Sequence, residues 1–150
     1  IIAEAGAGRT GVRFSPNGDT QGCDDSNPEA VFVPAAKWLG EQNIAFLELR
    51  EIGAQGTFGR TDVPKLSPLI RKVFAGPLIL NQDYGFADGQ ADLDRGIADA
   101  IAFGRPFIAN PDLVERFRSN AALAAPNPRT FYTAGPEGYV DYPALNAELV

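Results

Sequence analysis

Apolar residues follow two different periods along this chain. Short apolar runs of strand length lie at residues 12–15, 44–51, 77–80 and 98–103, and stretches with helical spacing begin near residues 28, 67, 86 and 111. This fourfold alternation of strand and helix predicts a parallel α/β sheet, either open and doubly wound or closed as a (β/α)8 barrel. Four such units in 150 residues amount to half a barrel. No G-x-G-x-x-G follows the first run, which argues against a dinucleotide-binding open sheet.

Local signals mark where the helices begin and end. The segments Asn27-Pro28-Glu29 and Asn110-Pro111-Asp112 each offer an Asn cap, a proline at the first helical position and an acid in the first turn. The second should start a helix that runs from Pro111 to about residue 120. Trp38 falls on the apolar side of the helix after Asn27, so we expect it in the core.

The first residues and the absence of methionine suggest that this sequence is a piece of a longer protein. Residues 1–6 have the pattern of a last helical turn closed by Gly6 at its C-cap. The chain contains no Met, so Ile1 is not a translation start. We therefore expect residues 1–150 to be part of one domain whose earlier portion is missing from this chain.

Arg13 should face the inside of the predicted sheet. Alternation in the first strand places Arg13 and Ser15 on one face and Val12 and Phe14 on the other. In a barrel covered by helices, the apolar face points outward and Arg13 points inward. An inward arginine needs an acidic partner, which is either a structural carboxylate such as Glu48 or an anionic ligand.

Polar residues stand at the end of every predicted strand. Because the carboxyl ends of parallel strands share one edge, these residues should gather there, and two or more arginines with amide donors suit a phosphorylated ligand. Gly104 would let backbone N–H groups approach a phosphate that Arg105 grips with its two-pronged guanidinium. The alternative is a buried strand whose terminal arginine pairs with a surface carboxylate. The set comprises Arg13, Ser15, Gln21, Arg50, Glu51, Asn81, Gln82, Asp83, Gly104 and Arg105.

Composition excludes several classes of function. The formal net charge of −6 argues against a nucleic-acid-binding surface, and no apolar run reaches the length of a membrane span. The chain has no histidine and a single cysteine, Cys23, so it offers neither a zinc site nor a Ser-His or Cys-His catalytic pair. A lone cysteine also suits a reducing cytoplasm.

Three segments resemble the carboxyl-terminal half of the Old Yellow Enzyme family, especially the bacterial 2-cyclohexenone reductase type. The similarity extends from about Gly11 to Pro143, and the block that ends in Phe-Ile-Ala-Asn-Pro-Asp is specific when it occurs with the Tyr-Val-Asp-Tyr-Pro ending. The resemblance implies a (β/α)8 TIM barrel to which this chain contributes strands five to eight. The segments are residues 11–16, residues 98–113, and residues 131–132 together with residues 137–143.

The resemblance also implies roles for individual residues. Arg13 would contact the pyrimidine edge of FMN near N1 and O2, where a positive charge stabilises the reduced anionic flavin. Gly104 and Arg105 would hold the FMN phosphate, and Gln21 and Tyr132 would line the substrate pocket, although Tyr132 could instead be a core aromatic of the tail. Backbone N–H groups of the turn Asn81-Gln82-Asp83 would assist at the phosphate, where many family members carry small residues instead.

The implied activity is the reduction of activated C=C bonds, in enones, enals and nitroalkenes, at the expense of NADH or NADPH. In this family a His-His or His-Asn pair grips the substrate and a tyrosine gives the proton. These residues belong to strand four, and this chain has no histidine, so it carries no complete catalytic site. We therefore expect a complementary amino-terminal half-barrel as its partner. A non-catalytic flavin-binding half-barrel and another phosphate-binding barrel enzyme remain alternatives.

Overall fold

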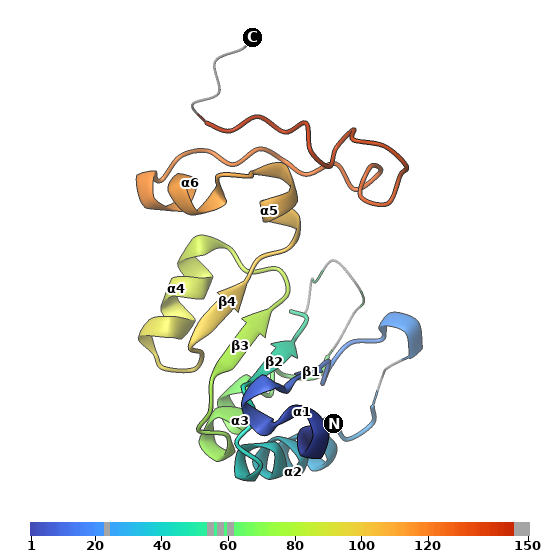
Figure 1. Cartoon of the computed structure of the whole chain (residues 1–150), viewed down its shortest axis with the longest axis vertical. Helices are drawn as coiled ribbons and strands as arrows, with labels where there is room; N and C mark the ends of the chain where they lie inside the picture. Colours follow the sequence, from blue (N-terminus) through green and yellow to red (C-terminus); the bar gives the residue numbers. More distant parts are fainter. Residues whose placement is uncertain (23–24, 54–55, 57–58, 60–61, 146–150) are drawn as a thin grey trace. The chain divides into compact units, whose positions relative to one another are not determined.

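The computed structural model describes residues 1–145 except 23–24, 54–55, 57–58 and 60–61, so Cys23 lies outside the described residues (Figure 1). The chain forms two compact units, Ile1–Ala102 and Phe103–Val150. The first contains α1 (Ile2–Ala5), η1 (Ala7–Arg9), β1 (Gly11–Phe14), η2 (Thr20–Gly22), α2 (Pro28–Glu41), β2 (Phe46–Arg50), α3 (Ser67–Val73), β3 (Leu78–Asn81), α4 (Phe86–Asp94) and β4 (Ala100–Ala102). The second contains α5 (Arg105–Ala109) and α6 (Leu113–Ser119).

The four strands form one parallel sheet in the order β1-β2-β3-β4. The order in space therefore follows the order in the chain. In a doubly wound sheet the strand order reverses at a switch point, whereas in a barrel wall neighbouring strands follow the order of the chain. Among the two architectures that the sequence allows, the strand order matches the barrel wall.

The two faces of the sheet differ in polarity. Leucines of β2 and β3, among them Leu47 and Leu80, are at most 1% exposed and lie on the face that the helices cover. Phe14 of β1 shares that face, since its ring packs edge-on against Phe32 of α2 with centroids 5.3 Å apart. The opposite face, which we call the inner face, includes Arg13, Glu48 and Asn81. Its polarity confirms the inward direction predicted for Arg13.

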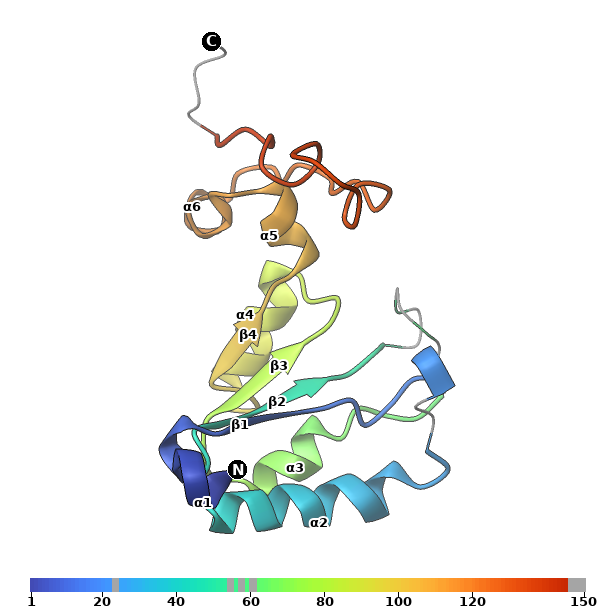
Figure 2. The same cartoon turned by 45° about the vertical axis from the view of Figure 1, so that its right-hand side comes forward.

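Helices α2 and α3 run side by side under the covered face (Figure 2). Asn27 caps α2, and its side-chain oxygen accepts a hydrogen bond from the N–H of Ala30 at 3.3 Å. Pro28 occupies the first turn, as the sequence predicts. At the start of the chain, α1 ends at Gly6, whose φ of 86° is a conformation that favours glycine.

The second unit is held together by two buried polar side chains. Asn110 is fully buried; its amide donates to the carbonyl of Pro106 at 2.8 Å and accepts from the N–H of Ala124 at 2.8 Å. Arg116 donates from Nε to Asp112 at 2.7 Å and from Nη1 to the carbonyl of Ala122 at 2.7 Å. The hydrogen bond from Arg116 holds the pKa of Asp112 below its usual value. These hydrogen bonds hold the irregular backbone of the second unit, which forms no β-sheet among the described residues.

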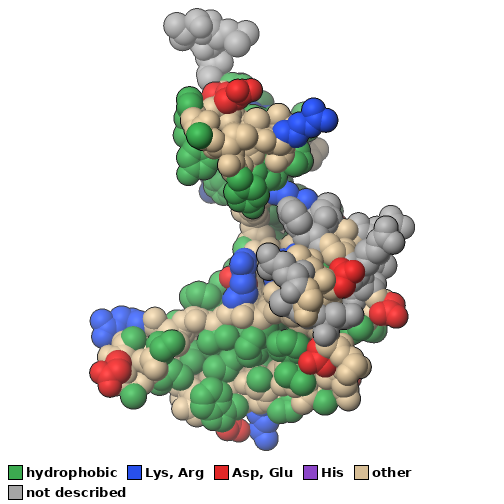
Figure 3. Space-filling model, turned by 90° about the vertical axis from the view of Figure 1, so that its right-hand side faces the viewer, with side chains coloured by type: hydrophobic (Ala, Val, Ile, Leu, Met, Phe, Trp, Pro, Cys, Tyr) green, Lys and Arg blue, Asp and Glu red, His purple; other side chains and the backbone are tan. Residues whose placement is uncertain are grey.

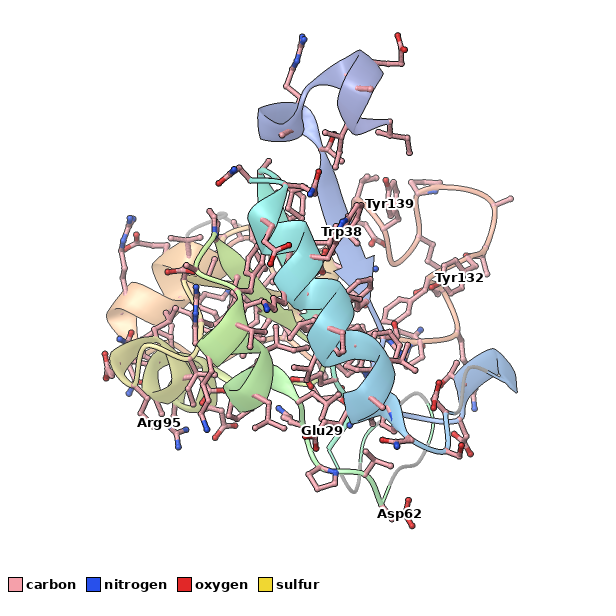
Figure 4. The ribbon with its side chains drawn as sticks, turned by 90° about the horizontal axis from the view of Figure 1, so that it is seen from below. Glu29, Trp38, Asp62, Arg95, Tyr132 and Tyr139 are labelled. Carbon is pink, nitrogen blue, oxygen red and sulfur yellow. The ribbon has the colours of Figure 1, made fainter. Side chains whose placement is uncertain are left out.

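Two expectations about the helices are wrong. The last predicted helix begins at Leu113 rather than Pro111, and Asn110 does not cap it because its side chain is bonded to Ala124 and Pro106. Trp38 is 55% exposed on α2, toward the opposite end of the helix from Glu29 (Figure 4), and is not a core residue. The sequence analysis also missed α5, which begins at Arg105, although Pro106 in its first turn is a helix-start signal.

Candidate functional site

A three-residue polar cluster stands on the inner face at the carboxyl end of the sheet. One carboxylate oxygen of Glu48 accepts from Nη2 of Arg13 at 2.7 Å and from the side-chain amide of Asn81 at 2.8 Å. The strand register brings these three side chains together. Arg13 lies directly beside Glu48, and Asn81 lies two positions beyond the residue that pairs with Glu48 on the next strand. Of the two partners foreseen for Arg13, the structure therefore shows the carboxylate of Glu48.

Exposure differs within this cluster. The side chain of Arg13 is 54% exposed, whereas that of Glu48 is 17% exposed. The bond to Glu48 uses one of the five N–H donors of the guanidinium. Arg13 is thus held at one terminal nitrogen of its guanidinium, while half of its side chain stays exposed on the inner face, where an anionic ligand can reach it.

Asn17 joins two loops at the same edge of the sheet. This side chain is 3% exposed; it accepts from the N–H of Ile52 at 2.9 Å and donates to the carbonyls of Ile52 at 3.0 Å and Val63 at 3.3 Å. It therefore ties the loop after β1 to both ends of the loop after β2. Sequence reasoning missed Asn17, since its partners lie 35 and 46 positions away.

Glu51 fastens the far end of that second loop. It is 1% exposed, and one of its carboxylate oxygens accepts from the backbone N–H groups of Leu66 and Ser67, just where α3 begins. Burial raises the pKa of the Glu51 carboxyl, and the hydrogen bonds oppose this only in part. Glu51 therefore has a structural role at this edge, carried by one of its two carboxylate oxygens.

The raised pKa of Glu51 predicts a specific pH dependence of stability. Unfolded Glu51 loses its proton near pH 4.5, whereas the folded carboxyl retains it to higher pH, so the free energy of unfolding falls as pH rises through this window. Glu51→Gln should remove that decline, because an amide does not titrate in this range. Urea unfolding between pH 4 and 8 measures it, with Glu41→Gln on the exposed end of α2 as control. An unchanged slope in Glu51→Gln would contradict the assignment.

The turn after β3 has an unusual backbone. Gln82 and Asp83 both have positive φ, 89° and 58°, a region that favours glycine. The amide of Gln82 donates to the Asp83 carboxylate at 3.0 Å. Of the small residues expected at this turn by resemblance, glycine would adopt the same backbone with less strain. The contribution of these two positions to a phosphate site stays a prediction.

Gly104 and Arg105 open the second unit. Gly104 is the N-cap of α5, and its carbonyl accepts from the N–H groups of Phe107 and Ile108. A Cβ placed on Gly104 would meet no atom within 4 Å, so its backbone is open to approach. Arg105 is the first residue of α5 and is partly buried. The predicted Gly-Arg pair thus stands at a helix start, although the helix is a different one from that expected.

The structure gives less information on Gln21 and Tyr132, the two residues predicted to line the substrate pocket. Gln21 lies in η2, and its side chain is outside the described part of the structure. Tyr132 is 94% exposed and projects from the irregular tail, as does Tyr139 (Figure 4). The alternative that Tyr132 is a core aromatic is therefore wrong, whereas its contact with substrate stays a prediction. Within the described ranges no group of acidic, Cys or His side chains could hold a metal ion, and no helix is long and apolar enough to span a bilayer.

A parallel α/β sheet with guanidinium and amide donors at the carboxyl ends of its strands is typical of enzymes that bind a ligand at that edge. The chain belongs to the NADH:flavin oxidoreductase / NADH oxidase family, whose sequence model matches residues 1–124, and within it to the Old Yellow Enzyme group. The family comprises FMN flavoproteins that use a reduced nicotinamide, and morphinone reductase has been solved with tetrahydroNAD.

Solved structures and curated relatives agree on this family. The Old Yellow Enzyme homologue of Zymomonas mobilis is 60% identical with a TM-score of 0.93, over 96% of this chain and 41% of that one. Morphinone reductase is 40% identical with a TM-score of 0.86, over 100% of this chain and 41% of that one. A 12-oxophytodienoate reductase-like protein of Solanum lycopersicum is 42% identical over 97% of this chain and 38% of its own length. The chain thus spans about two fifths of these relatives.

Proposed function

We propose that this chain is the carboxyl-terminal half of a (β/α)8 barrel, strands five to eight, in an FMN-dependent ene-reductase. The observation that carries the proposal is Arg13, held on the inner face by Glu48 with half of its side chain exposed. A cation in this place suits the pyrimidine edge of a reduced flavin. The reaction would be the NADH- or NADPH-consuming reduction of the C=C bond of an enone, enal or nitroalkene.

The residues present fit FMN in chemical type. In the first unit, Arg13 would bind around N1 and O2, and backbone N–H groups of residues 81–83 would assist at the phosphate. In the second unit, Gly104 and Arg105 would bind the phosphate through open backbone and a guanidinium. FMN, when bound, supplies hydride transfer between the nicotinamide and the alkene. Gln21 and Tyr132 would contact the substrate.

A complementary amino-terminal half-barrel would complete this protein. Among the described residues, β1 and β4 are the edges of the sheet, and each pairs on one side only. Hydrophobic side chains also cover much of the first unit's surface on the β1 side (Figure 3). Exposed sheet edges and broad apolar surfaces invite association. The missing half would cover them and would bring the histidines that this chain lacks.

Mass spectrometry and absorbance of the purified protein test the proposal. A second polypeptide together with stoichiometric FMN is the expected result. A lone 16.0 kDa chain without a flavin band would contradict it. The second candidate, a flavin-binding half-barrel without turnover, is favoured by the coverage of only 41% of the Zymomonas mobilis enzyme. Turnover of cyclohexenone with NADH or NADPH separates the two, because only the reductase consumes the nicotinamide.

A further inference from the structure

Glu48 is the centre of the polar cluster on the inner face. A single oxygen, Oε1, accepts from Arg13 on β1 at 2.7 Å and from Asn81 on β3 at 2.8 Å, so one carboxylate links three adjacent strands. The Glu48 side chain is 17% exposed and therefore lies deeper than Arg13, at 54%. A carboxylate so placed holds one terminal nitrogen of the guanidinium and leaves half of the arginine side chain exposed to a ligand.

We propose that Glu48 is a positioning residue that sets how strongly Arg13 favours reduced over oxidised flavin. The inference rests on the proposed function and adds to it a residue that does not touch the flavin. A guanidinium beside the flavin pyrimidine stabilises the negative charge that reduction creates there. A carboxylate 2.7 Å from the same guanidinium opposes this effect, because its negative charge partly cancels the field of Arg13.

The carboxylate therefore has two separable effects, one of geometry and one of charge. Glu48→Gln keeps a carbonyl oxygen that can accept hydrogen bonds but removes the negative charge. Glu48→Ala removes both and frees Arg13 and Asn81 from their shared partner. A residue that served only to satisfy Arg13 during folding would not alter the flavin's preference for one redox state.

The experiment measures the reduction potential of FMN in the flavin-containing protein by dye equilibration. For Glu48→Gln, we expect the ratio of affinities for reduced and oxidised FMN to rise about tenfold, which is about 30 mV more positive for a two-electron couple. For Glu48→Ala, we expect weaker binding of oxidised FMN, measured by fluorescence titration, because Arg13 is no longer held in place.

Asp99→Asn is the matched control. Asp99 pairs with Arg71 at 2.8 Å, an ion pair of similar length at the amino-terminal edge of the sheet, away from the proposed flavin edge. Its loss should leave the potential unchanged. A potential in Glu48→Gln equal to that of the unaltered protein would overturn the role of Glu48 while the flavin site stands. Failure of the unaltered protein to bind FMN would instead overturn the proposed function, and this inference with it.

Discussion

Replacing Arg105 by alanine is expected to weaken FMN binding by about 3 kcal/mol, on the order of 100-fold in Kd. Arg105 is the partly buried first residue of α5, directly after the open backbone of Gly104. A phosphate that loses a guanidinium partner keeps its charge but loses two aligned hydrogen bonds, which a lysine restores only in part. Fluorescence titration of FMN into the flavin-free protein measures the loss of affinity. The affinity of Arg105→Lys should fall between those of Arg105→Ala and the unaltered protein.

Arg118→Ala supplies the control for that experiment. Arg118 also lies in the second unit, on α6, but its side chain is 72% exposed and pairs with Glu115 at 3.6 Å on the surface. Such a pair contributes little to stability, and its removal should leave flavin affinity unchanged. Equal affinities for the Arg105→Ala protein and the unaltered protein would remove Arg105 from the phosphate site.

Asn17→Ala should lower the free energy of unfolding of the protein by about 3 kcal/mol. The substitution leaves the N–H and the carbonyl of Ile52 without their buried partner and also removes the weaker bond to Val63. Each buried polar group left unsatisfied costs about 1–3 kcal/mol. Asn17→Asp should be at least as destabilising, because a buried carboxylate would face the carbonyl oxygens of Ile52 and Val63 and cannot donate to them. Urea denaturation followed by circular dichroism gives both values.

Gln90→Ala is the comparison for Asn17. The Gln90 amide donates to Asp94 on the exposed surface of α4, so its loss should change stability by less than about 0.5 kcal/mol. If Asn17→Ala were as mild as Gln90→Ala, the Asn17 side chain would not be holding the loop ends. Hydrogen exchange at the Ile52 amide would show the same effect locally, with faster exchange in Asn17→Ala.

The hydrophobic periodicity predicted the strands and helices because it reflects which side of each element is buried. The strand predictions overlap all four strands, and the alternation that turned Arg13 inward is visible in its pairing with Glu48. The cap at Asn27 was predictable, since its partner Ala30 lies within the same turn. The carboxylate alternative for Arg13 could be named from sequence because both residues alternate on predicted strands.

The features that could not be predicted from the sequence depend on residues that are distant along the chain. Asn110 occurs in the same Asn-Pro-acid pattern as Asn27, yet it binds Ala124, fourteen positions away, and caps the end of α5 rather than the start of α6. Trp38 has helical spacing typical of a core position, but spacing alone does not reveal whether anything covers it. The bonds of Asn17 likewise depend on how two loops meet. Local patterns determine a residue's direction, whereas its partner depends on the assembled fold.

Asn17 and Glu51 hold the ends of the loop after β2 through its backbone and not through its side chains. Asn17 binds the backbone of Ile52 and Val63, and Glu51 binds the backbone of Leu66 and Ser67. Every residue type except proline offers the same backbone groups. These bonds therefore place no demand of their own on the exposed side chains of the loop, such as Asp62, whereas the buried Ile52 and Leu66 and the crowded Gly59 are constrained by packing. A lineage, or an engineer, could vary the exposed positions of this loop while its anchored ends stay constant.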